Sequence, residues 1–196
     1  MAQTSTTLIS AKSHITSITG TDISLSATSG VYTISATSTV LTGAGKLAVG
    51  DLITVSGSAS NNSTFTVSTV VSTLEITVAE VVTSENADGS STITLDHVGF
   101  VSDKAKGDGY YSQPDGVHTV AYQVANDFNA DATIKMQGTL ATTPTEDDWF
   151  DIANTTFISD TSTLTSSFNF TGNYVWVRSK TQLLTAGTVN SILLNS

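Results

Sequence analysis

Histidine is the first side chain to consider for catalysis or metal binding, and the chain has three: His14, His97 and His118. A metal site needs two or more such ligands that converge with carboxylates. These three residues lie in separate segments, and nothing in their spacing brings them together. We therefore expect histidines that are exposed or hydrogen-bonded for structural reasons, and we predict no metal site.

Acidic side chains form two groups that could bind Ca²⁺. One is the run Glu146–Asp148, which follows Pro144; the other lies in a glycine-rich stretch and comprises Asp103, Asp108 and Asp115. Oxygen-rich loops coordinate Ca²⁺, but neither group has the Asp-x-Asp-x-Asp-Gly spacing of a defined calcium loop. We expect solvated turns at both places, with a calcium loop as the alternative.

No set of side chains is spaced for catalysis. None of the 27 serines lies in a Gly-x-Ser-x-Gly elbow, so a Ser–His–Asp combination would arise only by chance. A glycosidase needs two carboxylates about 5 to 9.5 Å apart across a cleft, and no two acidic residues are paired by their spacing. We predict that the chain is not an enzyme, with no catalytic residue and no cofactor.

Aromatic side chains could instead bind a ligand, because sugar-binding sandwiches use exposed aromatic platforms. Tyr174 and Trp176 fall on one face of an expected strand, and two further pairs are Trp149-Phe150 and Tyr110-Tyr111. A domain with few large residues must build its core from those it has. We therefore expect core packing for these rings, with a sugar platform as the alternative.

Composition excludes several kinds of site and partner. The formal net charge is −10, and phosphate binding needs a concentrated Lys/Arg surface, so we predict no nucleic acid partner. The chain has no Cys, which removes disulfides, Cys-ligated metals and thiol nucleophiles. No apolar run approaches the roughly 20 residues of a membrane span, so we predict no membrane partner.

The elements that must position any site are strands. In 74–78 the apolar residues Leu74, Ile76 and Val78 alternate with polar ones, which places them on one face of a pleat. The same alternation occurs at 23–25, 32–34, 65–67, 93–95, 120–124 and 174–177. Short strands with frequent turns predict an all-β fold of two small antiparallel β-sandwich or barrel domains.

Composition also changes near residue 100, where we place the domain boundary. Residues 21–100 are rich in Thr, Ser and Val and predict one β domain, whereas 117–196 carry most of the aromatic residues and predict a β-sandwich. Residues 101–116, with Gly, Asp and Pro, predict a linker or large loop. Residues 1–20 are polar with sparse apolar side chains, so we expect an extended N-terminal arm that is disordered or ordered against a neighbouring subunit.

The segment 47–67 resembles a module of tailed-bacteriophage virion proteins. It contains Val49-Gly50-Asp51, then Val55-Ser56-Gly57-Ser58, then Asn61-Asn62-Ser63-Thr64-Phe65-Thr66-Val67, with Ser63 where the module usually has Gly. The strand 73–80 and the acidic hairpin 85–90 follow as they do in that module. A second stretch, 134–140 with Pro144, Trp149, 170–178 and 186–195, is similar to β-sandwich domains of phage structural proteins, especially those of marine and cyanobacterial phages.

The resemblance implies a non-enzymatic virion structural protein with no catalytic residues to carry over. Within that class we expect a capsid decoration (cement) protein on the outer surface of the capsid, which binds the major capsid protein lattice and self-associates, as a homotrimer, to stabilise the head. The alternative is a tail, neck or fibre component whose sandwich binds host glycan.

Overall fold

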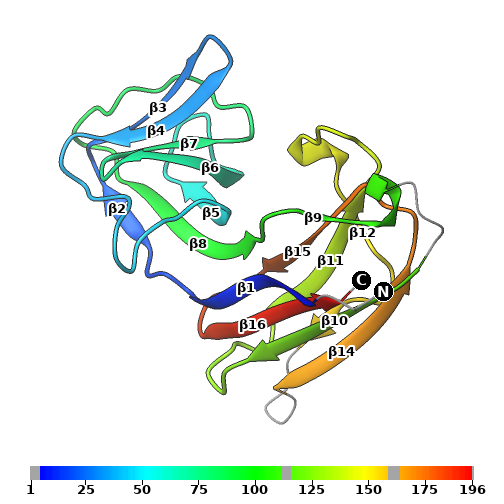
Figure 1. Cartoon of the computed structure of the whole chain (residues 1–196). Coiled ribbons are helices and arrows are strands. Elements are labelled where there is room, and N and C mark those ends of the chain that lie inside the picture. Colours follow the sequence, from blue (N-terminus) through cyan, green and yellow to red (C-terminus); the bar gives the residue numbers. More distant parts are fainter. Residues whose placement is uncertain (1–4, 112–115, 159–163, 196) are drawn as a thin grey trace. The chain divides into compact units, whose positions relative to one another are not determined.

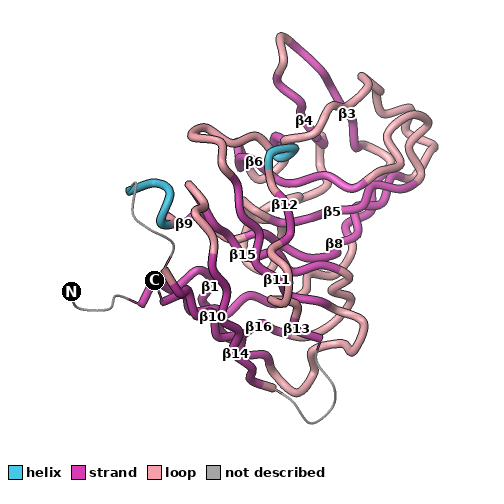
Figure 2. Tube along the Cα trace, turned by 90° about the vertical axis from the view of Figure 1, so that its right-hand side faces the viewer, coloured by secondary structure: helices cyan, strands magenta, loops and turns pink. Residues whose placement is uncertain are grey.

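A computed structural model describes residues 5–111, 116–158 and 164–195 and has the predicted all-β fold. Within these residues strands dominate, and the helical elements are the short turns η1 (Asp108–Tyr111) and η2 (Glu146–Asp148) (Figure 2). The strands pair antiparallel, and the sheets do not close into a barrel. Of the two architectures expected from the sequence, the β-sandwich is therefore the one that the structure supports.

The chain divides into two compact units. Unit 2 is one continuous segment, Ile15–Phe100, whereas unit 1 combines Met1–His14 with Val101–Ser196. Unit 2 is thus inserted into unit 1 after the first strand of unit 1. The boundary near residue 100 lies where the composition of the chain changes.

Unit 2 is built from strands that contribute to two sheet segments joined through β6. Its strands are β2 (Ile18–Gly20), β3 (Ile23–Thr28), β4 (Val31–Ala36), β5 (Asp51–Ser56), β6 (Thr64–Ser72), β7 (Glu75–Val78) and β8 (Ile93–Val101). The first half of β6 pairs with β5 and the second half with β7, and its register shifts at two places along β7. Such irregularities bend a strand and let it serve both segments.

Alternation along the strands produces the core of unit 2. In β7 the side chains of Ile76 and Val78 are buried, and Ile76 lies opposite Ile34 of β4. The polar residues between them face outward. Buried Ile, Leu, Val and Phe side chains from all the unit's strands and two of its loops form one cluster, and burying each contributes about 1.5–3 kcal/mol relative to exposure.

Unit 1 is a sandwich of two sheets. One sheet has the order β1 (Ser5–Ser13), β16 (Thr188–Asn195), β10 (Val117–Val124) and β14 (Thr165–Thr171). The other contains β9 (Ala105–Lys106), β11 (Thr133–Thr139), β12 (Phe150–Asp151), β13 (Phe157–Ile158) and β15 (Trp176–Gln182). Tyr122 of β10 is fully buried between them, packs on Phe157 and donates its hydroxyl proton to the carbonyl oxygen of Thr155.

The N-terminal segment differs from the expected arm. Residues 5–13 form β1, which pairs antiparallel with β16 of the same chain and lies beside it in Figure 1. Residues 18–20 form β2, which pairs with β8 of unit 2. The pairing of β1 needs few apolar side chains, because β1 is held mainly by backbone hydrogen bonds and buries only Ile9. Residues 1–4 lie outside the described residues.

The expected linker at 101–116 also has local structure. Ser102 donates its backbone N–H to the carbonyl oxygen of Ser179, and β9 pairs with β15. The turn η1 follows directly. This segment is therefore part of unit 1 as far as Tyr111, and residues 112–115 lie outside the described residues.

Candidate functional site

The structure places the three histidines in different surroundings. His97, in unit 2, is buried; its Nδ1 accepts the backbone N–H of Ile15, and its Nε2 lies 3.4 Å from Asp51 Oδ1. Because Nδ1 accepts, the ring proton belongs on Nε2, facing the carboxylate. His118, in unit 1, is buried 3.2 Å from Asp108 Oδ2 and stacks on Phe170. His14 donates its backbone N–H to Gly187. The rings of His97 and His118 thus have structural roles, and His14 contributes its backbone N–H.

The acidic groups are also engaged within the fold. Asp148 Oδ2 accepts hydrogen bonds from the backbone N–H and hydroxyl of Thr145, and these bonds hold the pKa of Asp148 below its ordinary value. Glu146 forms a bidentate ion pair with Arg178, at 2.8 and 2.7 Å. Asp108 accepts the backbone N–H of Gly116 at 2.6 Å, Asp103 is exposed, and Asp115 lies outside the described residues. Across the described ranges, no group of three His, Asp or Glu side chains could hold a metal ion.

The segment that resembles the phage module uses its polar residues to build turns. Gly50 has φ 84°, a left-handed conformation that favours glycine, and donates its N–H to Val67. Asp51 is fully buried, accepts the N–H of Ala48 at 2.7 Å and faces His97. Ser63, where the module usually has Gly, does not adopt a positive φ, so the turn accommodates a side chain there.

The turn after Gly57 is organised around a carboxylate. Glu85 accepts hydrogen bonds from the Ser58 hydroxyl (2.5 Å), the Ala59 N–H (2.9 Å) and the Asn61 side-chain amide (3.2 Å). These bonds, led by that from Ser58, lower the pKa of Glu85. Asn62 bonds in turn to Ser58. The polar side chains of this turn thus bond to one another and to Glu85.

Two exposed tyrosines of unit 1 lie beside a partly exposed tryptophan and two lysines, and we call this group the aromatic–lysine surface: Lys104, Lys106, Tyr110, Tyr111 and Trp176. The ring centroids of Tyr110 and Trp176 are 4.8 Å apart, and those of Tyr110 and Tyr111 are 5.2 Å apart. Lys104 Nζ lies 4.5 Å from the Trp176 centroid, and Lys106 Nζ lies 4.2 Å from that of Tyr110. Tyr110 and Tyr111 are 42% and 56% exposed, so the core packing expected for these two rings is wrong.

Two glycines bring these rings together. The backbone N–H groups of Gly107 and Gly109 donate to Val175 and Tyr174, just before β15. A Cβ on either glycine would overlap backbone atoms of that segment, so only glycine allows this close approach. The turn η1 that follows is therefore fixed beside Trp176, which starts β15.

Along β15 the same sheet face continues with charged residues. Trp176, Arg178 and Lys180 alternate with buried residues and so project to one side. Arg178 is almost fully buried: it pairs with Glu146, donates from Nε to Gln137, and lies 4.2 Å from the Trp149 ring.

Opposite β15, the adjacent strand adds a further charged pair to this face. Lys135 of β11 lies across from Lys180 and pairs with Asp151 at 2.5 Å. Burial, followed by the charges of Arg178 and Lys135, lowers the pKa of Lys180.

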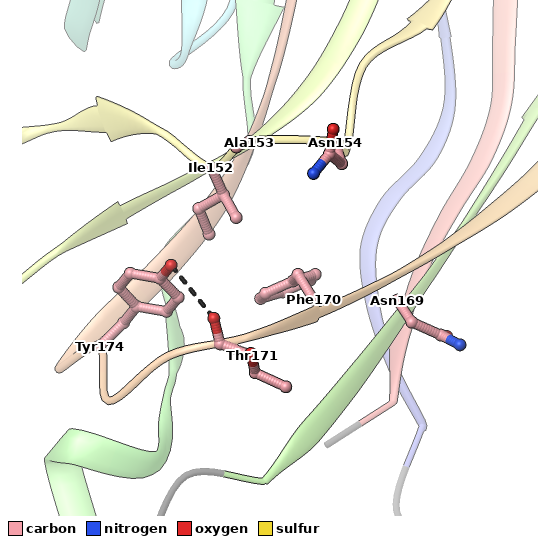
Figure 3. Close-up of a pocket in the computed structure, with 7 residues that line it drawn as sticks. All are labelled: Ile152, Ala153, Asn154, Asn169, Phe170, Thr171 and Tyr174. Atoms are coloured by element: carbon pink, nitrogen blue, oxygen red, sulfur yellow. Dashed lines mark hydrogen bonds between the residues drawn. The ribbon is translucent and has the colours of Figure 1, made fainter.

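Tyr174 behaves differently from Trp176. It precedes β15, and its ring packs against Phe150 and Phe170, over Gly138 and Gly172. With Ile152 and Phe170 it lines an open pocket of about 280 Å³, and its hydroxyl donates to the Thr171 carbonyl oxygen at 3.3 Å (Figure 3). The expected common face of Tyr174 and Trp176 is not formed, since alternation holds only inside a strand.

Comparison with known proteins adds no relatives: no protein-family model, curated protein or solved structure matches the chain. Among the described residues no helix is long and apolar enough to cross a membrane. The phage resemblance of 47–95 and of 134–195 therefore stays a prediction.

Sequence patterns gave only part of the aromatic–lysine surface. Tyr110, Tyr111 and Trp176 were candidates for a platform, but Lys104 and Lys106 were not. A local signal exists only for the turn, since the two glycines between Lys106 and Tyr110 indicate a tight turn. The position of Lys106 opposite Trp176 comes from the long-range pairing of β9 with β15.

Proposed function

We propose that the chain is a structural protein of a tailed-phage virion and decorates the capsid as a cement protein. The observation that carries this proposal is the role of the 47–67 segment. Gly50, Asp51, Ser58 and Asn61, which carry the resemblance, all serve the turns around β5 and β6. The residues that carry the resemblance therefore determine the fold of this segment. This supports a structural subunit, whose function is to present a surface to its neighbours.

The proposed partner is the lattice of the major capsid protein, and the proposed assembly is a homotrimer on the outer surface of the capsid. A protein that binds only the assembled lattice stabilises it by mass action. Specific interfaces of roughly 1,600 Å² suffice for each contact, and the virion repeats them many times.

Copy number tests the proposal. Quantitative mass spectrometry of purified particles would compare this chain with the major capsid protein. Near-stoichiometric abundance is expected for cement. A count between a few and a few dozen would contradict it and assign the chain to the tail, neck or fibres.

A second test measures the proposed stabilisation directly. Capsids stripped of this chain should release their genome at a lower temperature than intact capsids, and addition of the purified chain should restore the original value. Binding to capsids with no shift in the release temperature would contradict a cement role. Light scattering of the free chain would check for the trimer.

The alternative role, a tail, neck or fibre component that binds host glycan, is favoured by one observation. Tyr110 and Tyr111 lie beside Trp176 and are exposed, so their rings are accessible to a ligand and are not buried in the core.

A further inference from the structure

We propose that the aromatic–lysine surface binds a saccharide that carries an acidic group, with Lys104 and Lys106 on the acid and the rings of Tyr110, Tyr111 and Trp176 beside the sugar. The proposal goes beyond capsid decoration. It does not depend on where in a virion the chain lies, so failure in the copy-number test leaves it standing.

Geometry provides the first argument. Three rings from η1 and β15 lie within 5.2 Å of a neighbour, centroid to centroid, and two of them expose 42% and 56% of their surface. Exposed rings offer apolar faces to the C–H groups of a sugar, and the tyrosine hydroxyls offer hydrogen bonds to its hydroxyl groups.

The two lysines provide the second argument. Lys106 Nζ lies 4.2 Å from the Tyr110 centroid and 5.3 Å from that of Tyr111, while Lys104 Nζ lies over Trp176. Both ammonium groups thus lie against rings of the same cluster. A cation–π contact at an exposed site is weak, whereas an ammonium–carboxylate or ammonium–sulfate contact is a charge-assisted hydrogen bond. An anionic ligand can therefore replace the ring contacts.

Charge distribution provides the third argument. Five of the seven basic residues of this acidic chain belong to this sheet and the turn before it: Lys104, Lys106, Lys135, Arg178 and Lys180. Of the acidic residues near them, Glu146 pairs with Arg178 and Asp151 with Lys135, while Asp147 and Asp148 follow Glu146 in η2 and Asp103 precedes Lys104. This part of the chain is therefore less negative than the net charge of the whole chain suggests, which favours it over the rest of the chain for an anion.

The surface is also preorganised. Gly107 and Gly109 hold the turn against β15, and the Trp176 indole donates its N–H to the Thr142 carbonyl oxygen at 3.0 Å. Side chains held in place lose less entropy when a ligand binds.

The test uses the full chain with Trp149→Phe, which leaves Trp176 as the single tryptophan and so makes its fluorescence a local probe. Three hexasaccharides are titrated: β-1,4-linked mannuronate, β-1,4-linked mannose as its neutral match, and a sulfated galactose oligomer. We expect a saturable fluorescence change with mannuronate or the sulfated oligomer, and at least about tenfold weaker binding of the neutral oligomer. Binding of mannuronate would identify the acidic group as a carboxylate, and binding of the sulfated oligomer would identify it as a sulfate.

Two double variants, each of which removes two positive charges, provide the test of the lysines and its control. Lys104→Gln with Lys106→Gln should weaken acidic saccharide binding at least about tenfold, while Lys12→Gln with Lys46→Gln should leave it within about twofold. Circular dichroism checks that both stay folded. Equal binding of neutral and acidic oligomers, no response to either acidic oligomer, or equal losses in both double variants would overturn the proposal.

Discussion

Glu85 shows how one side chain can hold a turn and make its stability depend on pH. Its carboxylate accepts four hydrogen bonds from the 58–61 turn, and its pKa is lowered by them. Asp22 and Asp88 have pKa values well below the ordinary range for the same reason, because neighbouring hydroxyl and N–H groups bond to them. All three lie in unit 2.

A carboxylate with a lowered folded-state pKa stabilises the fold above its unfolded-state pKa, and the stabilisation is lost as pH falls through the folded-state pKa. We therefore expect the melting temperature of unit 2 to be nearly constant from pH 7 to 5 and to fall below about pH 4. Glu85→Gln should lower the melting temperature at pH 7 and reduce this acid dependence. Thermal melts at each pH check it, with Glu75→Gln as control; an equal effect of the control would contradict the role given to Glu85.

Replacing Lys180 should raise the melting temperature, whereas replacing Glu85 should lower it. It lies directly across from Lys135 and two residues from Arg178 on the same face, and like charges in such positions destabilise a sheet by about 0.2–1 kcal/mol. Lys180→Gln should raise the melting temperature by about 1–3 °C at low salt and by less at high salt. A lower melting temperature would show that Lys180 makes a favourable contact instead.

The turn between β5 and β6 depends on Gly57. Its φ is 79°, and an added Cβ would overlap the carbonyl oxygen of Thr92. Gly89 has a similar φ of 73° but open space around its Cα. Gly89→Ala should cost about 1–2 kcal/mol of unfolding free energy, and Gly57→Ala clearly more, because backbone must also move. Urea unfolding of the two variants measures the difference, and equal losses would contradict the steric explanation.

Strands with strict alternation could be predicted from the sequence, and those with irregular registers could not. In 120–124 the pattern predicts a strand, and β10 buries Val120, Tyr122 and Val124. In β1 the adjacent apolar residues Leu8 and Ile9 break the alternation. The structure gives the reason: the register with β16 shifts between Thr7 and Ile9, so a bulge places Leu8 there.

The aromatic–lysine surface could also be predicted only in part, because its exposure is not visible in the alternation of residues. Tyr110 and Tyr111 carry no periodic signal, and their exposure follows from the contacts of Gly107 and Gly109 with the segment before β15. Those contacts join residues more than 60 positions apart. Composition alone therefore favoured core packing, whereas tertiary contacts decide which rings remain exposed.

The insertion of unit 2 into unit 1 predicts which fragments of the chain fold alone. Unit 2 has its own core and is one continuous segment, so residues 15–100 alone should fold and melt cooperatively. Residues 101–196 alone lack β1, which leaves the β16 edge unpaired and prone to aggregate.

Joining residues 1–14 to 101–196 through a flexible Gly-Ser linker of about ten residues should restore a monomeric unit 1. Gel filtration and circular dichroism of the three fragments check this. A well-folded, monomeric 101–196 fragment would show that β1 is dispensable, and an unfolded 15–100 fragment would show that unit 2 depends on unit 1.

The pairing of β1 with β16 also sets an order of events during synthesis. Ser13 and Thr188 hydrogen-bond although 175 positions separate them, and a ribosome adds about 5–20 residues per second. The partner of β1 therefore emerges roughly 10–35 s after β1 itself. Unit 2 is complete in the interval and can fold while β1 still has an open edge. The nascent chain thus passes through a stage in which one unit is native and the other waits for its last strand, and it is at this stage that a chaperone would be of most use.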